Sequence, residues 1–403
     1  MSIVLAYSGG LDTSFCIPWL KENTGQDVIA VTVNTGSVGE GDIDSFRARA
    51  MELGAADYVV VDARRDLYDR ILSYLIKGNV LRGGVYPLCV GPERVIQADH
   101  TVRLALERGA KAIAHGSTGA GNDQVRFDVA LRLLGPDIDI IAPIRDEGFS
   151  RAYTTGYLRE RGFDVPAKKT TYSINAGLWG TTIGGKETAG TTEPLPEDAY
   201  TLTAGPDEWP TEAETITIRY EQGHPVAVNG TEMDPISLIE HLNKIGAKHG
   251  VGRGNHIGDT ILGIKGRVGF EAPAPDILIR SHRELEKVVL TKWQRYQKDQ
   301  LGEFYGMLLH EAGYYDPVMR DIEAFLDSSQ GRVSGTVTVR LFAGHAEVTG
   351  CESPASLFDT GVAVYGEENA LWSGADAKGF SRIAGVQQYL AATVGRKMEE
   401  VGS

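Results

Sequence analysis

The chain has 403 residues, of which 42% are hydrophobic and 23% charged, so it is long enough for two or three domains. Acidic residues outnumber basic ones by 54 to 40, and the net charge of −14 argues against a nucleic-acid partner. The scattered Cys16, Cys89 and Cys351 exclude a disulfide framework and are typical of free cytoplasmic thiols. The first apolar run is too short for a signal peptide, and no run of about 18 apolar residues could span a membrane. We therefore expect a cytoplasmic protein without a membrane partner.

Residues 1–165 alternate short apolar runs with amphipathic stretches, as in a parallel sheet covered on both faces. The expected strands are residues 3–7, 28–34, 58–62, 112–116 and 138–142. The expected helices, each followed by a glycine stop signal, are residues 13–22, 43–53, 94–107 and 122–134. This alternation predicts an α/β fold, a doubly wound parallel sheet, for a nucleotide-binding domain over residues 1–165.

The rest of the chain predicts an α+β synthetase domain over residues 166–365. Residues 166–200 are rich in Thr, Gly, Lys and Pro and predict a long irregular segment, and whether it closes over a site is left open. Beyond it we expect two hairpins (215–220 with 226–228, and 332–341 with 346–349), a strand (261–264) and two helices (235–248 and 283–311). A C-terminal helical arm over residues 366–403 has an apolar stripe along residues 381–401.

A glycine-rich loop joins the first expected strand to the first expected helix. It reads Ala6-Tyr-Ser-Gly-Gly-Leu-Asp-Thr-Ser14. Its glycines permit close backbone approach to a phosphate, and its hydroxyls and the amides at the helix start can bind phosphate oxygens. Asp12 is placed to help hold a Mg²⁺ that neutralises bound phosphates, and we assign no metal ligand beyond it.

The segment from Ser8 to Ser14 resembles the loop of the ATP pyrophosphatase superfamily, whose members cleave ATP between its α and β phosphates. It matches neither Gly-x-x-x-x-Gly-Lys-Ser/Thr nor Gly-x-Gly-x-x-Gly. Amide synthetases, tRNA thiolases and sulfurtransferases share this loop. It therefore predicts the ATP chemistry and leaves the acceptor open.

A second polar cluster, residues 115–127, follows the strand expected at residues 112–116. In an open α/β sheet this places it near the first loop, at the carboxyl edge where ligands bind. Thr118 and Asn122 offer hydrogen bonds, Asp123 offers a carboxylate for an amine, and Arg126 offers a guanidinium for a carboxylate. Such a set suits an amino-acid ligand.

Together the two motifs closely resemble those of argininosuccinate synthetases, and the likeness covers nearly the whole chain. It includes Tyr86, Arg94 and residues 27–30, 141–143, 248–253, 266–267, 270–271, 352–354 and 356–357. The resemblance implies a ligase of arginine biosynthesis. ATP and citrulline would form citrullyl-AMP, and the amine of aspartate would displace AMP to give argininosuccinate. It also implies a homotetramer with exchanged C-terminal helices.

The resemblance assigns roles to residues of this chain. ATP would be bound by Ala6, Tyr7, Ser8, Gly9, Gly10, Leu11, Asp12, Thr13, Ser14 and Gly116. Aspartate would be bound by Thr118, Asn122 and Asp123. Citrulline would be bound by Tyr86, Asn122, Arg126, Ser173 and Thr182. Asp12 and Asp123 would have positioning roles in catalysis, because the chemistry requires no protein nucleophile.

The acceptor contacts depart from the family pattern. The family commonly has Tyr-x-x-Gly-Thr-Ser-x-x-Arg-Pro, and its citrulline-contacting serine falls on Gly91. A glutamate that holds citrulline falls on Gly258, and a tyrosine falls on Phe270. Thr182 stands for a second serine and keeps the hydroxyl. A hydrogen bond to a charged group is worth roughly 1.5–3 kcal/mol, so the three changes bear directly on acceptor binding.

Two explanations of these changes stay open. In a divergent branch of true argininosuccinate synthetases, Asp259, Thr182, Glu93 or His256 compensates. Alternatively, the same chemistry acts on a different ureido or amide acceptor. A tRNA-modifying enzyme is disfavoured by the net charge and by the lack of Cys-x-x-Cys, and a binding protein without turnover is disfavoured by the intact motifs.

Overall fold

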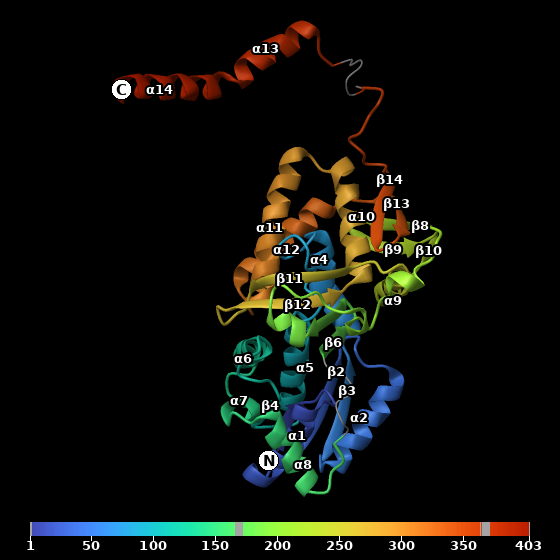
Figure 1. The fold of residues 1–403 in the computed structure, drawn as a ribbon, viewed down its shortest axis with the longest axis vertical. Helices are drawn as coiled ribbons and strands as arrows, with labels where there is room; N and C mark the ends of the chain where they lie inside the picture. Colours follow the sequence, from blue (N-terminus) through green and yellow to red (C-terminus); the bar gives the residue numbers. More distant parts are fainter. Residues whose placement is uncertain (1, 166–171, 363, 365–370, 403) are drawn as a thin grey trace. The chain divides into compact units, whose positions relative to one another are not determined.

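The computed structural model describes residues 2–165, 172–362, 364 and 371–402. The chain divides into two compact units, Met1–Ala355 and Ser356–Ser403. The larger unit holds one parallel and two antiparallel sheets with their helices (Figure 1). Within the described residues, no helix is long and apolar enough to cross a membrane.

Five parallel strands form the first sheet in the order β3-β2-β1-β4-β5. They are β1 (Ser2–Ala6), β2 (Asp27–Asn34), β3 (Asp57–Asp62), β4 (Ala112–His115) and β5 (Asp139–Ile141). Because successive side chains of a strand point to opposite faces, Ile3 and Leu5 join one hydrophobic core while Val4 joins another. Both faces are therefore buried, which confirms the predicted doubly wound sheet.

Helices cover both faces of this sheet. In the core of Ile3, α1 packs on α8, and the rings of Phe15 and Tyr157 lie 4.8 Å apart. In the other core, Val95 of α5 and Phe127 of α6 pack with the strands. The helices of this part are α1 (Leu11–Thr24), α2 (Glu40–Glu52), α3 (Arg64–Leu67), a π-helical turn (Tyr68–Leu72), α4 (Ser73–Lys77), α5 (Glu93–Glu107), α6 (Asp123–Leu134), α7 (Pro143–Asp146) and α8 (Arg151–Glu160).

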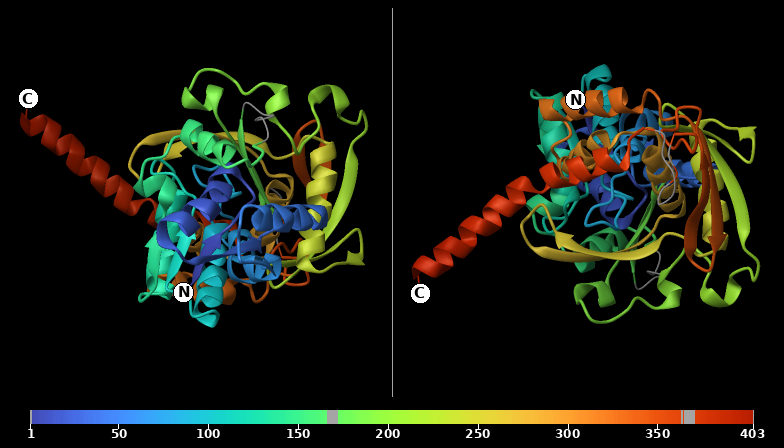
Figure 2. Two further views of the ribbon diagram at one scale, coloured as in Figure 1. Left: turned by 90° about the horizontal axis from the view of Figure 1, so that it is seen from below. Right: turned by 90° about the horizontal axis from the view of Figure 1, so that it is seen from above.

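Two antiparallel sheets form the rest of the larger unit. The order β10-β9-β8-β13-β14 joins Thr231–Glu232, His224–Val228, Glu214–Glu221, Gly335–Phe342 and His345–Glu352. The order β11-β12-β7-β6 joins Arg253–Asp259, Lys265–Glu271, Gly180–Gly184 and Ser173–Gly177. The helices are α9 (Pro235–Lys248), α10 (Pro273–Val289), α11 (Lys292–His310) and α12 (Pro317–Gln330). Both predicted hairpins and the predicted helix over 235–248 are confirmed, and the yellow-green β8–β9 hairpin lies at the rim of this unit (Figure 2).

Two predictions about strands are wrong. The segment predicted to be irregular contains the β6–β7 hairpin, although residues 166–171 lie outside the described residues. The strand predicted over 261–264 is the turn between β11 and β12. Glycines interrupt the alternating pattern of these two strands, so the apolar turn gave the stronger signal. The glycines are Gly254, Gly258, Gly266 and Gly269.

The single helix predicted over residues 283–311 is also wrong in part. It is two helices, because α10 ends at Val289 and a new helix starts after Thr291. The hydroxyl of Thr291 accepts a hydrogen bond from the amide of Gln294, and the side chain of Gln294 accepts one from the amide of Thr291. This reciprocal capping box is an ordinary start signal for a helix.

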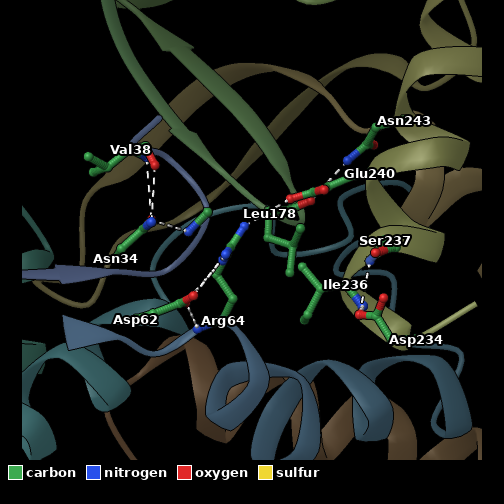
Figure 3. Close-up of polar contacts among 11 residues, drawn as sticks. Asn34, Val38, Asp62, Arg64, Leu178, Asp234, Ile236, Ser237, Glu240 and Asn243 are labelled. Atoms are coloured by element: carbon green, nitrogen blue, oxygen red, sulfur yellow. Dashed lines mark hydrogen bonds and ion pairs between the residues drawn. The ribbon is translucent and has the colours of Figure 1, made fainter. Parts of the chain in front are cut away.

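Polar contacts join the parallel-sheet part to the antiparallel part. Arg64, just after β3, forms an ion pair with Asp62 at the end of that strand. It forms a second one, at 3.3 Å, with Glu240 on α9 (Figure 3). Asn243 of α9 donates a hydrogen bond to the carbonyl of Leu178, in the turn of the β6–β7 hairpin. The amide of Leu178 also donates to the carbonyl of Thr35, so the hairpin is held next to the loop that follows β2.

A buried polar network ties residues 77–79 to the helices of the antiparallel part. Asn79 donates to Glu286 at 2.6 Å, and Lys298 pairs with Glu286 at 3.0 Å and donates to the carbonyl of Lys77. The two ring nitrogens of His282 contact Asn79 and Gln330. A buried ion pair is tolerated where its remaining groups are hydrogen-bonded, as they are here.

The C-terminal unit contains α13 (Gly374–Ala384) and α14 (Val386–Gly402). The apolar stripe predicted along residues 381–401 runs over both helices, which are separated at Gly385. Large apolar side chains on these helices are exposed, namely Phe380, Ile383, Leu390, Val394 and Met398.

Candidate active site

The glycine-rich loop passes directly from β1 into α1. The N-cap of α1 is Gly10, which has no side chain to cap the first amides of the helix, so these donors are available to a ligand. Thr13 braces the loop, since its hydroxyl donates to the carbonyl of Gly10 and accepts from the amide of Ser8. Gly9 has a positive φ of 72°, and the ring of Phe46 lies against it. Together these contacts form a cradle of backbone donors, an arrangement that suits an anion such as phosphate.

The second cluster begins where β4 ends, beside β1 in the sheet. Strand order reverses between β1 and β4, and the crevice at such a point is the usual ligand site of this fold. Gly116 lies against the start of α1: a Cβ added there would be 3.0 Å from Cγ2 and 3.1 Å from the amide nitrogen of Thr13. The glycine therefore lets the two motif loops meet.

Asp123, the first residue of α6, bridges two guanidinium groups. Its carboxylate accepts from Arg94 at 3.0 Å and from Arg126 at 2.9 Å. Burial favours the neutral acid, but the two arginines outweigh it and lower the pKa of Asp123. The carboxylate is therefore anionic at neutral pH, which suits the binding of an ammonium group and is unfavourable for a general base.

Arg126 is almost fully occupied by protein partners. Its guanidinium donates to the carbonyl of His310 at 3.0 and 3.1 Å, contacts Nδ1 of His310 and pairs with Asp123. A Cβ added at Gly91 would lie 3.0 Å from Cζ of Arg126, so the glycine leaves room for the guanidinium. The arginine is thus held at one fixed position within the second cluster.

An aromatic group lies at the other end of the site. The ring of Tyr86 stacks on His256 of β11, with centroids 5.5 Å apart and an interplanar angle of 16°. Phe270 of β12 packs on Tyr86 at 5.2 Å. Thr182 of β7 pairs with Phe270 in the sheet. Side chains from three distant segments of the chain, one of them the β11–β12 hairpin, therefore build this end.

Glu93 begins α5 and is 2% exposed. Its Oε2 atom accepts a hydrogen bond from Thr35, whereas Oε1 has no partner among the described residues. A side chain at Gly177 would collide with Oε1. Burial raises the pKa of Glu93 to about 7, against the opposing effects of Arg94 and Thr35.

One cleft, with a volume of about 1000 Å³, is lined by residues of both motif loops, by Glu93 and by Tyr86 and His256. Of the residues that the resemblance assigns, it is lined by Ala6, Tyr7, Ser8, Gly10, Leu11, Asp12, Thr13, Tyr86, Gly116, Thr118, Asn122, Asp123, Arg126, Ser173 and Thr182. Gly9 and Ser14 are outside this lining; Ser14 is buried, with its hydroxyl 3.5 Å from the Tyr7 hydroxyl. Of the departing positions, Gly91 and Gly258 line the cleft, and Phe270 packs behind Tyr86.

Sequence reasoning assigned no role to several residues of the lining. His310, on the last turn of α11, comes from a distant segment and fixes Arg126 through its carbonyl oxygen, a contact that no local pattern encodes. Arg151 on α8 and Arg267 on β12 add positive charge to the lining. Among the described residues, no group of three His, Cys, Asp or Glu side chains is arranged to hold a metal.

Comparisons with known proteins agree with this site. A family model described as the arginosuccinate synthase N-terminal HUP domain matches residues 2–164, and one described as the C-terminal domain matches residues 172–391. An argininosuccinate synthase of Xanthomonas campestris is 42% identical over 98% of this chain and 99% of its own length. One of Dehalococcoides mccartyi is 40% identical over 99% and 98%, and one of Methanocaldococcus jannaschii is 39% identical over 91% and 92%. The family resemblance seen in the motifs is thereby confirmed: the chain belongs to the argininosuccinate synthase family of ligases.

Proposed function

We propose that the chain joins citrulline to aspartate while cleaving ATP to AMP and pyrophosphate, the reaction that forms argininosuccinate in arginine biosynthesis. The observation that carries this proposal is the meeting of the two motif loops after β1 and β4 in one cleft. Membership of the family over nearly the whole chain supports it.

The proposed chemistry proceeds in two steps. The ureido oxygen of citrulline attacks the α-phosphorus of ATP, the bond from that phosphorus to the β-phosphate breaks, and pyrophosphate leaves. The ureido carbon is otherwise a poor electrophile, because two nitrogens donate electrons into it. The amine of aspartate then attacks this carbon and loses a proton while AMP leaves. The protein needs only to hold the reactants in line and stabilise charge.

The loop at the start of α1 is the proposed phosphate site. The loop offers the uncapped amides after Gly10 and the hydroxyls of Ser8 and Thr13. Such donors are suited to hydrogen-bond the oxygens of a polyphosphate. Mg²⁺, when bound with ATP, would neutralise the leaving pyrophosphate. Asp12 would help hold it, because Mg²⁺ is often bound by one or two carboxylates together with substrate phosphates. Burial raises the pKa of Asp12 against the charge of Arg151, and a nearby cation would favour its ionised form.

The amino-acid substrates are proposed to bind on either side of Asp123. The anionic Asp123, with Thr118 and Asn122, would orient the amine of aspartate. Tyr86, Asn122, Arg126, Ser173 and Thr182 would bind citrulline. Asn122 also accepts a hydrogen bond from the amide of Ile261, which ties the β11–β12 turn to this cluster.

Pyrophosphate release tests the proposal directly. The purified protein is given ATP and Mg²⁺, aspartate, and each of a panel of ureido acceptors, with one reactant omitted at a time. We expect release that requires ATP and citrulline, with net argininosuccinate formation that also requires aspartate. Release with another ureido compound, and none with citrulline, would overturn the assignment of the acceptor.

We further propose a cytoplasmic homotetramer in which the C-terminal helices are exchanged between subunits. The exposed apolar side chains of α13 and α14, including Ile383, Leu390 and Met398, support a partner for these helices. We also propose the domain division at about residues 165 and 365. Sedimentation of a chain truncated after residue 378 tests the arm, since an unchanged oligomer would contradict it.

A further inference from the structure

The ring of His256 lies in the end of the cleft that is proposed to bind the acceptor. It comes from β11 and stacks on the buried Tyr86, which also contacts Phe270. His256, Tyr86 and Thr182 all line the cleft. The imidazole is therefore part of the wall at this end of the cleft.

Two glycines make room for this ring. A Cβ added at Gly258 would lie 2.5 Å from Nε2 of His256, which is closer than real Cβ contacts. A Cβ added at Gly83 would lie 3.0 Å from Cε1 of the same ring. In this chain the imidazole thus occupies the space that any side chain at position 258 would need.

The Nε2 atom of His256 is buried and has no hydrogen-bond partner among the described residues. Among the other buried histidines, His282 and His115 differ in this respect, whereas Nδ1 of His249 and Nε2 of His310 also lack a partner among the described residues. His282 has both ring nitrogens in contact with side chains, and His115 contacts Asp128 and the amide of Ser117. Buried polar atoms are nearly always paired, so an unpaired one in a cleft wall indicates a partner that arrives with a ligand.

The charge state of His256 defines the kind of contact it can make. Burial, together with the nearby Arg82, lowers the pKa of His256, so the ring is neutral at physiological pH. A neutral imidazole offers one donor and one acceptor nitrogen. It can hydrogen-bond an amino or a carboxyl group, and it cannot form the ion pair that a carboxylate at this place would form with an ammonium group.

We propose that His256 is a specificity-determining residue of the acceptor pocket, whose Nε2 atom hydrogen-bonds the amino-acid head of the ureido acceptor from the space above Gly258. This inference rests on the proposed function, because it takes the acceptor to be a ureido amino acid. In this proposal the contact is made by the imidazole of His256, and Gly258 makes no contact with the acceptor. The affinity for the acceptor then depends on the Nε2 atom as well as on the shape of the ring.

The substitution His256→Phe separates the nitrogen from the ring. Phenylalanine keeps the stacking on Tyr86 and removes the hydrogen bond. Steady-state pyrophosphate release would be measured with each substrate varied in turn. We expect the KM for the acceptor to rise about tenfold, the loss of one hydrogen bond, while the KM values for ATP and aspartate stay within about twofold. His345→Phe, at an exposed position on β14, is the matched control and should leave all three KM values unchanged.

A second variant reaches the same atom from the other side. In Gly258→Ala, the added Cβ would displace Nε2, and we expect the same selective rise in acceptor KM. This variant also serves if His256→Phe does not fold, which thermal unfolding would reveal. The proposal is overturned if the acceptor KM is unchanged in a folded variant, or if all three KM values rise together. Wild-type release with citrulline tests the function separately, so either idea can fail alone.

Discussion

The two ends of the cleft are built differently. At the end proposed to bind ATP, called the nucleotide end below, one short loop supplies backbone donors, and its hydrogen bonds link neighbours such as Ser8, Gly10 and Thr13. At the end proposed to bind the acceptor, called the acceptor end below, side chains from distant segments meet, as Tyr86 does with His256 and Phe270. The contacts available at the first end are set by the path of the backbone. Those at the second end are set by the side chains that fill a fixed space.

This difference explains where the chain departs from the family pattern. A backbone-built phosphate site changes only if its glycines or its turn change, and those residues match the superfamily loop. A pocket built from side chains on rigid strands can exchange contacts while the fold stays the same. The exchanged positions, Gly91, Gly258 and Phe270, all lie at or behind the acceptor end.

The largest expected effect lies at the junction of the two ends. Asp123→Asn removes the carboxylate that neutralises Arg94 and Arg126, and it removes the proposed partner of the aspartate amine. We expect kcat/KM for aspartate to fall about a thousandfold, corresponding to about 4 kcal/mol for unpairing close charges. Asp137→Asn, at an exposed position, controls for the loss of a carboxylate. A loss below tenfold would show that Asp123 holds no substrate.

The next effect probes the backbone-built end. Gly116→Val would place methyl groups against Thr13, where even a Cβ is 3.0 Å from the nearest atom. We expect at least a hundredfold loss of kcat/KM for ATP, because the two loops could no longer meet. Gly156→Val on α8, where a Cβ meets open space, is the control. Equal losses in the two variants would contradict the close-approach explanation.

The substitution Glu93→Gln is expected to change the free energy of unfolding while leaving the contacts of the two motif loops unchanged. The folded-state pKa of Glu93 is about 7 and the ordinary value is 4.5, so the folded state binds more protons between these pH values. Stability from this group is therefore present below about pH 4.5 and is lost as the pH rises toward 7. Glutamine cannot ionise and does not lose this stability. We therefore expect the free energy of unfolding of the variant, relative to that of wild type, to be about 2 kcal/mol larger at pH 8 than at pH 5. Denaturant unfolding at both pH values measures this, and a difference that is the same at both would contradict the buried charge.

The smallest effect concerns a hydroxyl at the acceptor end. Thr182→Ala removes it, and we expect the acceptor KM to rise two- to fivefold, equivalent to about 1 kcal/mol or less. Thr182→Ser keeps the hydroxyl and should restore the wild-type value. A change in the KM for ATP of similar size would place Thr182 outside the acceptor contacts.

Much of the nucleotide-binding fold follows from local sequence, and less of the acceptor end does. The buried parallel strands are continuous apolar runs, and residues 28–34 correspond closely to β2. The strand that carries His256 contains Gly254 and Gly258, so no alternating pattern marks it. Glycine is required at both positions because rings of neighbouring residues fill the space that a side chain would need. Strand propensity is a property of single residues and does not include such contacts.

The buried state of Glu93 could not be predicted for a related reason. An acidic residue at the start of a helix is ordinary and usually exposed. Its burial results from Thr35 after β2 and Gly177 in the β6–β7 hairpin, which pack on α5 only in the folded chain. Position along the sequence therefore identified the motif loops, and tertiary packing defined the pocket that they serve.

Transfer of ¹⁸O is the most direct test of citrulline activation in this cleft. Citrulline labelled with ¹⁸O in its ureido group is converted with ATP and aspartate, and the AMP is examined by mass spectrometry. If the ureido oxygen attacks the α-phosphorus, one ¹⁸O atom appears in AMP for each argininosuccinate formed. Unlabelled AMP, or pyrophosphate formed without citrulline, would contradict the proposed activation.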